Sequence, residues 1–250
     1  MKASLTVRVL MLAAASVLSL ASAADAPAAG ASKVDAILAK YIEALGGRAA
    51  IEKITNSVAK AVSTVNGTEI QVEITRAAPS SQASRVEIPG MGTMREVYDG
   101  RKAWAANPFQ GITERTGEEL AKLARDAVFH QPLQMKQLFA PLTYAGTETV
   151  GGKKLEVLAA RLPGGAVEKF WFSSETGLLA QRESEHDTSA GRMKNFLKFE
   201  DYRPVNGVQQ PHAVQMKIEP PDQGVLEFEM KVTEVRQNVV LPANAFAKPE

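Results

Sequence analysis

The 250-residue chain contains no cysteine. This absence excludes disulfide bonds, thiolate zinc sites, iron–sulfur clusters and a cysteine nucleophile. The chain also lacks an excess of either charge, because 29 lysines and arginines face 28 aspartates and glutamates, for a formal net charge of +1. Such a balance is atypical of nucleic-acid-binding proteins, which need a strongly basic surface. We therefore expect no nucleic-acid partner.

The sequence has little that points to metal binding or catalysis. Its three histidines, His130, His186 and His212, are far apart, and none has a second histidine at the spacing of a helical metal site. Glu185 and Asp187 flank His186, but in a strand they would share the face opposite the histidine. Phosphate-binding, dinucleotide-binding and serine-hydrolase motifs are absent. We expect no metal, no cofactor, no catalytic residue and no enzyme activity; only an acid–base pair assembled from distant strands is left open.

The first 23 residues have the pattern of a secretory signal peptide. Lys2 and Arg8 precede an apolar run from Val9 to Leu20, and Ala21-Ser22-Ala23 fits a cleavage site. The apolar run is shorter than the roughly 20 residues that cross a bilayer. Because the chain has no cysteine, no lipid anchor can follow cleavage. We predict signal cleavage after Ala23, a periplasmic protein without lipidation, and no membrane span in the mature chain.

The mature chain is predicted to be one domain over residues 32–250, preceded by a flexible tether of small residues over 24–31. Ser32 and Asp35 resemble a capping box, and the apolar residues that follow have the spacing of one helix face. Gly46-Gly47 is typical of a helix end. We expect a short second helix over residues 48–54.

From Thr55 the apolar period changes from 3.6 to 2, which indicates strands. Asn66-Gly67 predicts a tight hairpin turn between the first two of them. Alternation lapses between Thr113 and Leu142, where capping signals and prolines predict a helical insertion. The predicted strands cover 57–65, 68–76, 85–88, 93–98, 102–106, 143–150, 154–162, 167–173, 178–185, 193–202, 213–219 and 225–235.

These elements predict an α+β fold. About 11–12 antiparallel strands in one sheet must curl, so we expect a single strongly curved antiparallel sheet that forms an incomplete barrel. The apolar face of such a sheet needs a cover, and only the N-terminal helix and the helical insertion are available. We therefore expect helices across the concave face.

Methionines and aromatic residues gather in the segments that would lie over the open barrel. Such side chains are adaptable and are common where an irregular apolar ligand is accepted. The alternative is that they fill the barrel as core. One long acyl chain in such a cavity would contribute on the order of 10 kcal/mol, at roughly 0.8 kcal/mol per methylene. The candidate ligand-binding residues are Met91, Met94, Trp104, Phe109, Leu120, Leu123, Phe129, Leu133, Met135, Leu138, Phe139, Met216, Phe228 and Met230.

Several segments together resemble the outer-membrane lipoprotein-sorting protein family, the LolA-like group that shares its fold with LolB and RseB. They are Leu45-Gly46-Gly47, the run 168–172 (EKFWF) leading into 175–179 (ETGLL), and the run 201–208 (DYRPVNGV) followed by Pro211. The resemblance covers nearly all of residues 33–248. It implies an incomplete antiparallel barrel with helices as a lid. It also implies an arginine that ties the lid closed, which no motif of this sequence locates.

Two functions follow as hypotheses. The first is a periplasmic carrier or binder of lipid or acylated lipoprotein, whose partners are acyl chains and the envelope proteins that donate or accept them. The second is a non-catalytic envelope interaction or sensor module, similar to RseB, with a filled barrel and a functional outer surface. A cavity larger than a water molecule favours the first.

Overall fold

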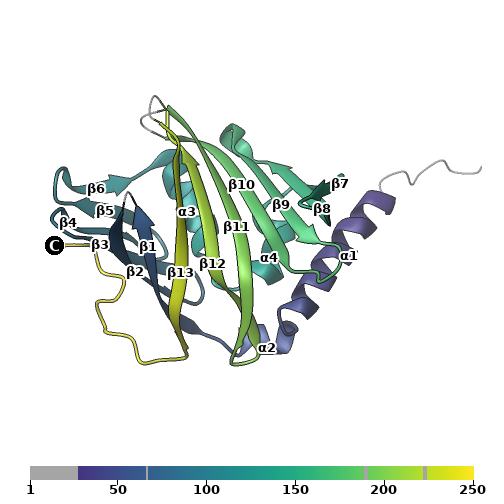
Figure 1. Ribbon diagram of the computed structural model, residues 1–250, viewed down its shortest axis with the longest axis horizontal. Coiled ribbons are helices and arrows are strands. Elements are labelled where there is room, and N and C mark those ends of the chain that lie inside the picture. Colours follow the sequence, from purple (N-terminus) through teal and green to yellow (C-terminus); the bar gives the residue numbers. More distant parts are fainter. Residues whose placement is uncertain (1–27, 66, 189–190, 222–223) are drawn as a thin grey trace, which may run out of the picture.

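The structure is a computed structural model that describes residues 28–65, 67–188, 191–221 and 224–250. Its first element is helix α1 (Ala28–Ala44), followed by the short helix α2 (Arg48–Glu52). Helix α1 ends where Gly46 and Gly47 take positive φ angles of 116° and 85°, which confirms the predicted helix end. Figure 1 shows α1 lying at one end of the sheet.

The start of α1 differs from the prediction. The helix begins at Ala28, so Ser32 lies inside it and is not its N-cap. The predicted tether is therefore wrong for residues 28–31, which belong to α1. Most of these residues are alanine, which has the highest helix propensity of all residues, so the helix extends through them. Residues 24–27 and the predicted signal peptide over 1–23 lie outside the described residues.

Strands β1 to β6 follow α2 and pair consecutively. They are β1 (Asn56–Val65), β2 (Thr68–Ala77), β3 (Ser81–Ile88), β4 (Gly92–Tyr98), β5 (Ala103–Asn107) and β6 (Gly111–Arg115). Val65 pairs with Thr68, which confirms the predicted two-residue turn between the first two strands.

Two helices separate this group from the remaining strands. They are α3 (Gly117–Ala127) and α4 (Gln131–Leu138). The second group consists of β7 (Leu142–Val150), β8 (Lys153–Arg161), a 3-10 turn (Pro163–Gly165), β9 (Val167–Ser173), β10 (Leu179–Thr188), β11 (Gly191–Val205), β12 (Val208–Glu219) and β13 (Leu226–Gln237).

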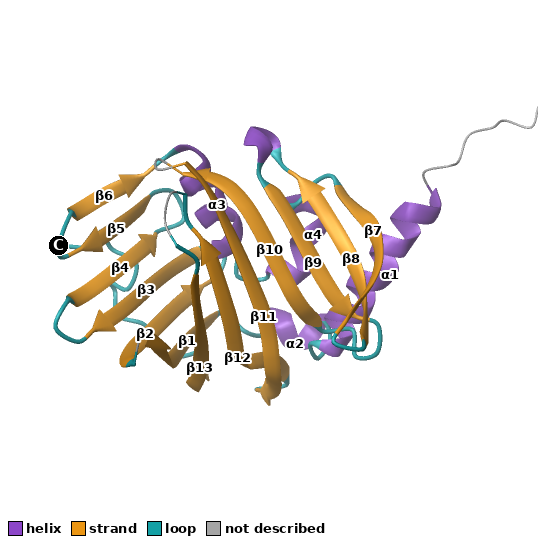
Figure 2. Ribbon diagram, turned by 45° about the horizontal axis from the view of Figure 1, so that its top comes forward, coloured by secondary structure: helices purple, strands orange, loops and turns teal. Residues whose placement is uncertain are grey.

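All of these strands form one antiparallel sheet in the order β6-β5-β4-β3-β2-β1-β13-β12-β11-β10-β9-β8-β7. The first and last strands of the chain pair in the middle of the sheet. Within the described residues, β6 and β7 each have one partner, so the sheet is open. The chain passes from one sheet edge to the other through α3 and α4 (Figure 2). An open antiparallel sheet with few helices confirms the predicted α+β class.

The strand count corrects the prediction of 11–12, because the described sheet has 13 strands. The additional strand is β6, whose last three residues, 113–115, fall within the predicted helical insertion. Its five residues are too few to display alternation, and four of them are exposed. The insertion is helical only from Gly117.

The helices all pack on the same face of the sheet, which we call the inner face. The ring of Tyr41 in α1 lies 5.1 Å from that of Phe172, and the ring of Phe139 at the end of α4 lies 4.8 Å from that of Phe170. Phe170 and Phe172 share a face of β9 because they are two residues apart. Arg182 of β10 pairs with Phe170 in register and contacts α3 from that face.

Packing divides the inner face into two halves. The main core lies between α1, α2, α4 and strands β7–β10, and its fully buried members include Phe139, Leu158, Phe170 and Phe172. On β2, β3 and β11–β13 many inner-face side chains are also apolar but only half-buried. These are Ile70, Val72, Ile74, Val86, Leu197, Phe199, Met216, Phe228, Met230 and Val232. The helices therefore fill one half of the inner face and leave the other half incompletely packed.

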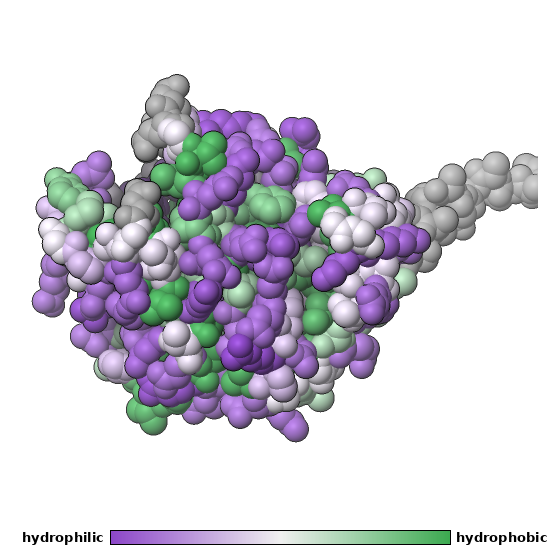
Figure 3. Space-filling model, in the orientation of Figure 1, coloured by the Kyte–Doolittle hydropathy of each residue, from purple (hydrophilic) through white to green (hydrophobic). Residues whose placement is uncertain are grey.

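The opposite face, which we call the outer face, is largely polar. Cross-strand and same-strand ion pairs such as Lys217–Glu219 and Lys60–Glu234 cover β1 and β10–β13. Figure 3 shows this face as mostly hydrophilic, with small scattered apolar spots. The chain end from Val239 runs past the outer face of β1–β4 (Figure 1). None of the helices within the described ranges is long and apolar enough to span a membrane.

Candidate functional site

A cavity of about 470 Å³ lies between the incompletely packed half of the inner face and the helices. Its volume falls within the range of about 300–1,000 Å³ that is usual for small-molecule sites. One wall consists of inner-face side chains of β1, β2 and β11–β13. The opposite wall consists of the ends of α1 and α2 and the segment between α3 and α4. The apolar side chains that line it include Tyr41, Leu45, Ile51, Ile54, Ala59, Ile74, Phe129, Leu197, Phe199, Val214, Met230 and Val232.

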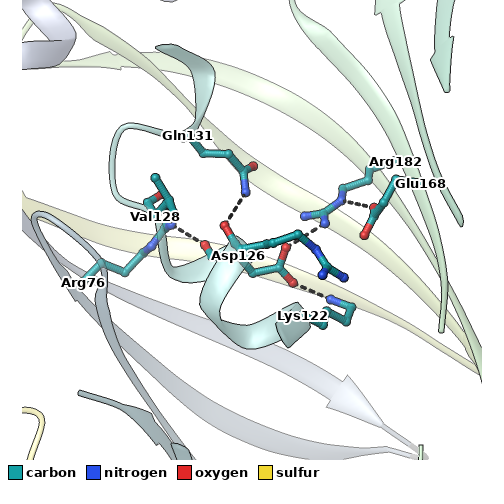
Figure 4. A network of polar contacts seen from close by, with 8 residues as sticks. Arg76, Lys122, Asp126, Val128, Gln131, Glu168 and Arg182 are labelled. Carbon is teal, nitrogen blue, oxygen red and sulfur yellow. Dashed lines mark hydrogen bonds and ion pairs between the residues drawn. The ribbon is translucent and has the colours of Figure 1, made fainter. Parts of the chain in front are cut away.

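The polar part of the cavity wall is organised around Arg182 of β10. Its Nη2 donates to Oδ1 of Asp126 in α3 at 2.7 Å, and its Nε donates to Oε2 of Glu168 in β9 at 3.0 Å. Lys122, one turn before Asp126 on α3, pairs with the other carboxylate oxygen of Asp126. Figure 4 shows these side chains converging between α3 and the sheet. The ion pairs tie α3 to β9 and β10.

Burial and neighbouring charge set the protonation of this network. Burial raises the pKa of the Asp126 carboxyl, but the charges of Arg182 and Lys122 outweigh burial and hold that pKa well below its usual range. Burial lowers the pKa of Arg182, but the charges of Asp126 and Glu168 outweigh burial. The pKa of Arg182 is therefore raised above its usual value. The guanidinium also lies 5.6 Å from the centre of the Phe139 ring and 5.5 Å from that of Phe170. Arg182 and Asp126 are therefore both charged.

Arg76 of β2 contacts α3 from the other half of the sheet. Its Nη2 donates to the backbone carbonyl oxygens of Asp126 at 2.7 Å and Val128 at 3.1 Å. The guanidinium lies 5.9 Å from the centre of the Phe129 ring. Burial lowers the pKa of Arg76, and the Asp126 charge partly offsets that effect. The C-terminal end of α3 is thus held to both halves of the sheet, as Figure 4 shows.

Two further side-chain hydrogen bonds involve the residues that join α3 to α4. The side chain of Gln131 donates to the carbonyl oxygen of Arg125 at 3.1 Å. Nε2 of His130 lies 2.8 Å from the carbonyl oxygen of Ile54, which follows α2. A few polar contacts and the half-buried ring of Phe129 therefore close this side of the cavity.

The histidine between Glu185 and Asp187 behaves as strand geometry predicts. His186 is 6% exposed and lies on the inner face beside α3, whereas both carboxylates pair with Arg192 on the outer face. Burial, with the nearby Lys122 charge, lowers the pKa of His186 to about 4. Within the described part of the chain, no three His, Asp or Glu side chains are grouped to hold a metal ion.

The structure places the predicted ligand-binding residues in six environments. Phe129 and Met230 line the cavity. Met94, Met216 and Phe228 lie elsewhere on the incompletely packed inner face. The others lie in the main core (Leu133, Met135, Leu138, Phe139), in a small core under α3 (Leu120, Leu123), on the outer face (Trp104) or at exposed hairpin turns (Met91, Phe109).

Three of these placements differ from the expectation that all the residues lie over the barrel. Trp104 pairs with Val97, and paired residues of neighbouring strands share a face. The pairings continue from Val97 through β3 and β2 to Val58, which lies on the outer face. Its neighbours in β5 are both alanine, so the sequence offers no alternation from which to assign its face. Met91 and Phe109 are 48% and 66% exposed because they lie in turns.

Sequence reasoning missed Arg76 and Arg182. Arg76 had a recognisable signal, because it continues the apolar phase of Ile70, Val72 and Ile74 on β2 and therefore points to the inner face. A cation in that phase indicates a buried polar partner or a site. Arg182 has no comparable signal, since its contacts with Glu168 and Asp126 arise only from tertiary structure.

No protein-family model matches the chain, and no curated protein sequence matches it. Solved structures do match its architecture. A DUF1329 family protein of Desulfovibrio piger superposes with a TM-score of 0.54 at 14% identity, covering 85% of this chain and 96% of the other. A LolA superfamily protein of Nitrosomonas europaea superposes with a TM-score of 0.51 at 14% identity, covering 86% and 97%.

A third match is an outer membrane lipoprotein-sorting protein domain of Vibrio parahaemolyticus, with a TM-score of 0.53 at 11% identity, covering 88% of this chain and 96% of the other. The fold is LolA-like. The resemblance found in the sequence is therefore confirmed for the fold. At such low sequence identity, structural similarity supports only the assignment of the fold. The function is therefore inferred from the cavity.

Proposed function

We propose that the protein binds and carries lipid or acylated lipoprotein, with apolar chains held between the sheet and the helices. The observation that carries this proposal is the cavity of about 470 Å³ beside an apolar inner face that the helices leave half-buried. Apolar side chains in a finished core are normally close-packed. Here they are available to a ligand that brings its own apolar surface.

The chemistry of the wall suits an acyl chain. Burial of each methylene contributes roughly 0.8 kcal/mol, so a long chain binds strongly without specific polar contacts. We propose that Phe129 and Met230 contact the chain in the cavity. The inner-face residues Met94, Met216 and Phe228 extend the apolar path beyond it.

We infer that the inner face is the concave face of the sheet and that α3 and α4 act as its lid. Entry of a chain requires a wall that can move. The segment between α3 and α4 is a good candidate, because hydrogen bonds from Arg76 and His130 hold it and its contact with the main core is the half-buried ring of Phe129. Pro132 and Pro141 delimit α4, but Met135 and Phe139 anchor this helix in the main core, so we place the moving part of the wall in the segment before it.

We place the protein in the periplasm, on the basis of its N-terminal signal pattern and the absence of cysteine. A soluble carrier there would receive its lipid from one envelope partner and deliver it to another. We propose binding rather than catalysis. Asp126 and Glu168, which are acidic groups beside the cavity, are held in ion pairs with Arg182 and are poorly suited to proton transfer.

The proposal is tested on protein isolated from its own periplasm. Native mass spectrometry should find a bound mass that organic extraction releases and lipid analysis identifies. The delipidated protein should bind a fluorescent fatty acid saturably. Apoprotein alone in the isolate, together with no binding of the fluorescent fatty acid, would contradict the proposal and favour a filled, non-binding sensor module.

A further inference from the structure

Arg76 is a cation in the cavity wall without a carboxylate partner among the described residues. Its Nη2 is satisfied by two backbone carbonyl oxygens, but its Nε is buried and has no hydrogen-bond partner. A buried donor without a partner is costly, and more so when it carries charge. This donor belongs to a residue that lines the cavity.

The neighbouring acidic groups cannot neutralise Arg76, because other cations already hold them. Asp126 accepts from Arg182 and pairs with Lys122, and Glu168 accepts from Arg182. Arg76 reaches this network only through the backbone of Asp126 and Val128. The network in Figure 4 therefore joins Lys122 and Arg182 to two carboxylates, and Arg76 adds a positive charge that no third carboxylate of the described chain pairs with.

On the inner face Arg76 pairs with two uncharged polar residues, Ser57 of β1 and Gln82 of β3, and its other neighbours are largely apolar. Ile74 precedes it on the same face of β2, and the Phe129 ring lies against its guanidinium. Leu197, Phe199 and Met230 line the same cavity from β11 and β13. A positive charge at one wall and apolar side chains on the others match a molecule with one charged end and one apolar end.

We propose that the cavity binds an amphiphile with a single anionic head group, which accepts a hydrogen bond from Nε of Arg76 while its chain lies along the inner face. This inference rests on the proposed lipid-binding function and specifies its ligand class. A fatty-acid carboxylate and the phosphate of a lysophospholipid share the required chemistry. Either anion supplies the charge that the network lacks and satisfies the buried donor.

The test compares charged and neutral ligands of the same chain length. Nile red, a neutral apolar dye, is bound to the delipidated full-length protein and displaced by oleate, by oleoyl lysophosphatidylglycerol or by methyl oleate, each delivered from cyclodextrin. We expect at least one anionic ligand to displace the dye about tenfold to a hundredfold more effectively than methyl oleate, the range that a charged hydrogen bond gives. Inorganic phosphate, which has no chain, should not displace it.

Variants assign the preference to Arg76. Arg76→Gln should abolish the preference, so that the preferred anion and methyl oleate displace the dye from this variant about equally well. Arg76→Lys, which keeps the charge, should retain part of the preference. Arg85→Gln is the matched control, because Arg85 lies on the outer face of the adjacent strand β3 in an exposed pair with Glu87; it should behave as the wild type. Circular dichroism establishes that each variant is folded.

The outcomes separate this inference from the proposed function. Equal displacement by methyl oleate and both anions in the wild type overturns the anionic head group but leaves lipid binding intact. A preference that survives in Arg76→Gln also overturns it. If neither the dye nor any oleoyl ligand binds, both proposals fail. If Arg76→Gln does not fold, the wild-type ratio of anion to ester and the Arg76→Lys variant still decide the matter.

Discussion

Nη2 of Arg182 donates to Oδ1 of Asp126 over 2.7 Å, although the two residues are 56 positions apart in the chain. The contact joins β10, in the second strand group, to α3, in the connection that crosses the inner face. Both side chains are largely buried, at 12% and 19% exposure. Removal of one partner from such a pair leaves an uncompensated charge in the interior.

We therefore predict that Asp126→Asn lowers the free energy of unfolding by about 2–4 kcal/mol, which is somewhat less than for a fully buried pair. Urea denaturation measures the loss. Asp201→Asn is the control, because Asp201 pairs with Arg203 in solvent and its replacement should change stability little. Similar losses in the two variants would show that the Arg182–Asp126 contact does not hold α3 to the sheet.

Stability should depend on His186 in mildly acidic solution. Its pKa is lowered from an ordinary value of 6.5 to about 4 in the folded state, so the unfolded chain binds a proton first as the pH falls. The stabilisation is complete above pH 6.5 and is lost between pH 6.5 and 4, by about 2 kcal/mol after solvent screening is allowed for. In His186→Gln this part of the pH dependence should be missing. An unchanged slope between pH 6.5 and 4 would refute the assignment.

The end of α1 depends on a glycine. A Cβ atom at Gly46 would lie 2.0 Å from the carbonyl oxygen of Gly207, and the φ angle of Gly46 is +116°. We predict that Gly46→Ala lowers the free energy of unfolding by at least about 3 kcal/mol, from backbone strain and overlap together. Gly207→Ala is the matched comparison, because φ is +82° there and no atom lies near its Cβ position. It should cost about 1–2 kcal/mol from strain alone.

Filling the cavity should reduce binding without unfolding the protein. Ala59 lines the cavity from β1, so we predict that Ala59→Phe lowers the capacity for a fluorescent fatty acid while the thermal midpoint stays close to that of the wild type. Val62→Phe places the same ring on the outer face of β1 and serves as the control. Equal binding by the wild type and both variants would place the ligand outside this cavity.

Much of the fold was predictable because alternation is a strong signal in a sheet with one apolar face. Ile70, Val72 and Ile74 fix the phase of β2, and the structure has the hairpin that follows from it. The short strand β6 was missed because five mostly exposed residues carry no such signal. The number of strands was therefore underestimated, although the α+β class was correct.

The site was less predictable than the fold. Methionine and aromatic content does not distinguish a residue of the core from one that lines a cavity, and Met135 and Phe139 proved to be buried at 3% and 0% exposure. The difference depends on how far the helices extend over the sheet, which local sequence does not encode. The Arg182 network likewise depends on three distant segments meeting. Of the two arginines, only Arg76 could have been found from the sequence, because it continues the alternation of inner-face apolar residues on β2.

Apolar chains are proposed to bind on the inner face of the sheet, within the cavity. Both tryptophans lie on the outer face, since Trp171 packs with Leu155 and Val157 and Trp104 pairs with Val97. Phe199 lines the cavity. Phe199→Trp therefore introduces the only tryptophan expected beside a bound chain.

The most direct measurement is quenching of tryptophan fluorescence by stearate that is brominated in the middle of its chain. In Phe199→Trp we expect saturable quenching of the added fluorescence, and in the wild type, whose tryptophans face away from the cavity, we expect almost none. Addition of unbrominated stearate should reverse the quenching by competition. Saturable quenching of the wild-type tryptophans, or no quenching in Phe199→Trp, would contradict the account.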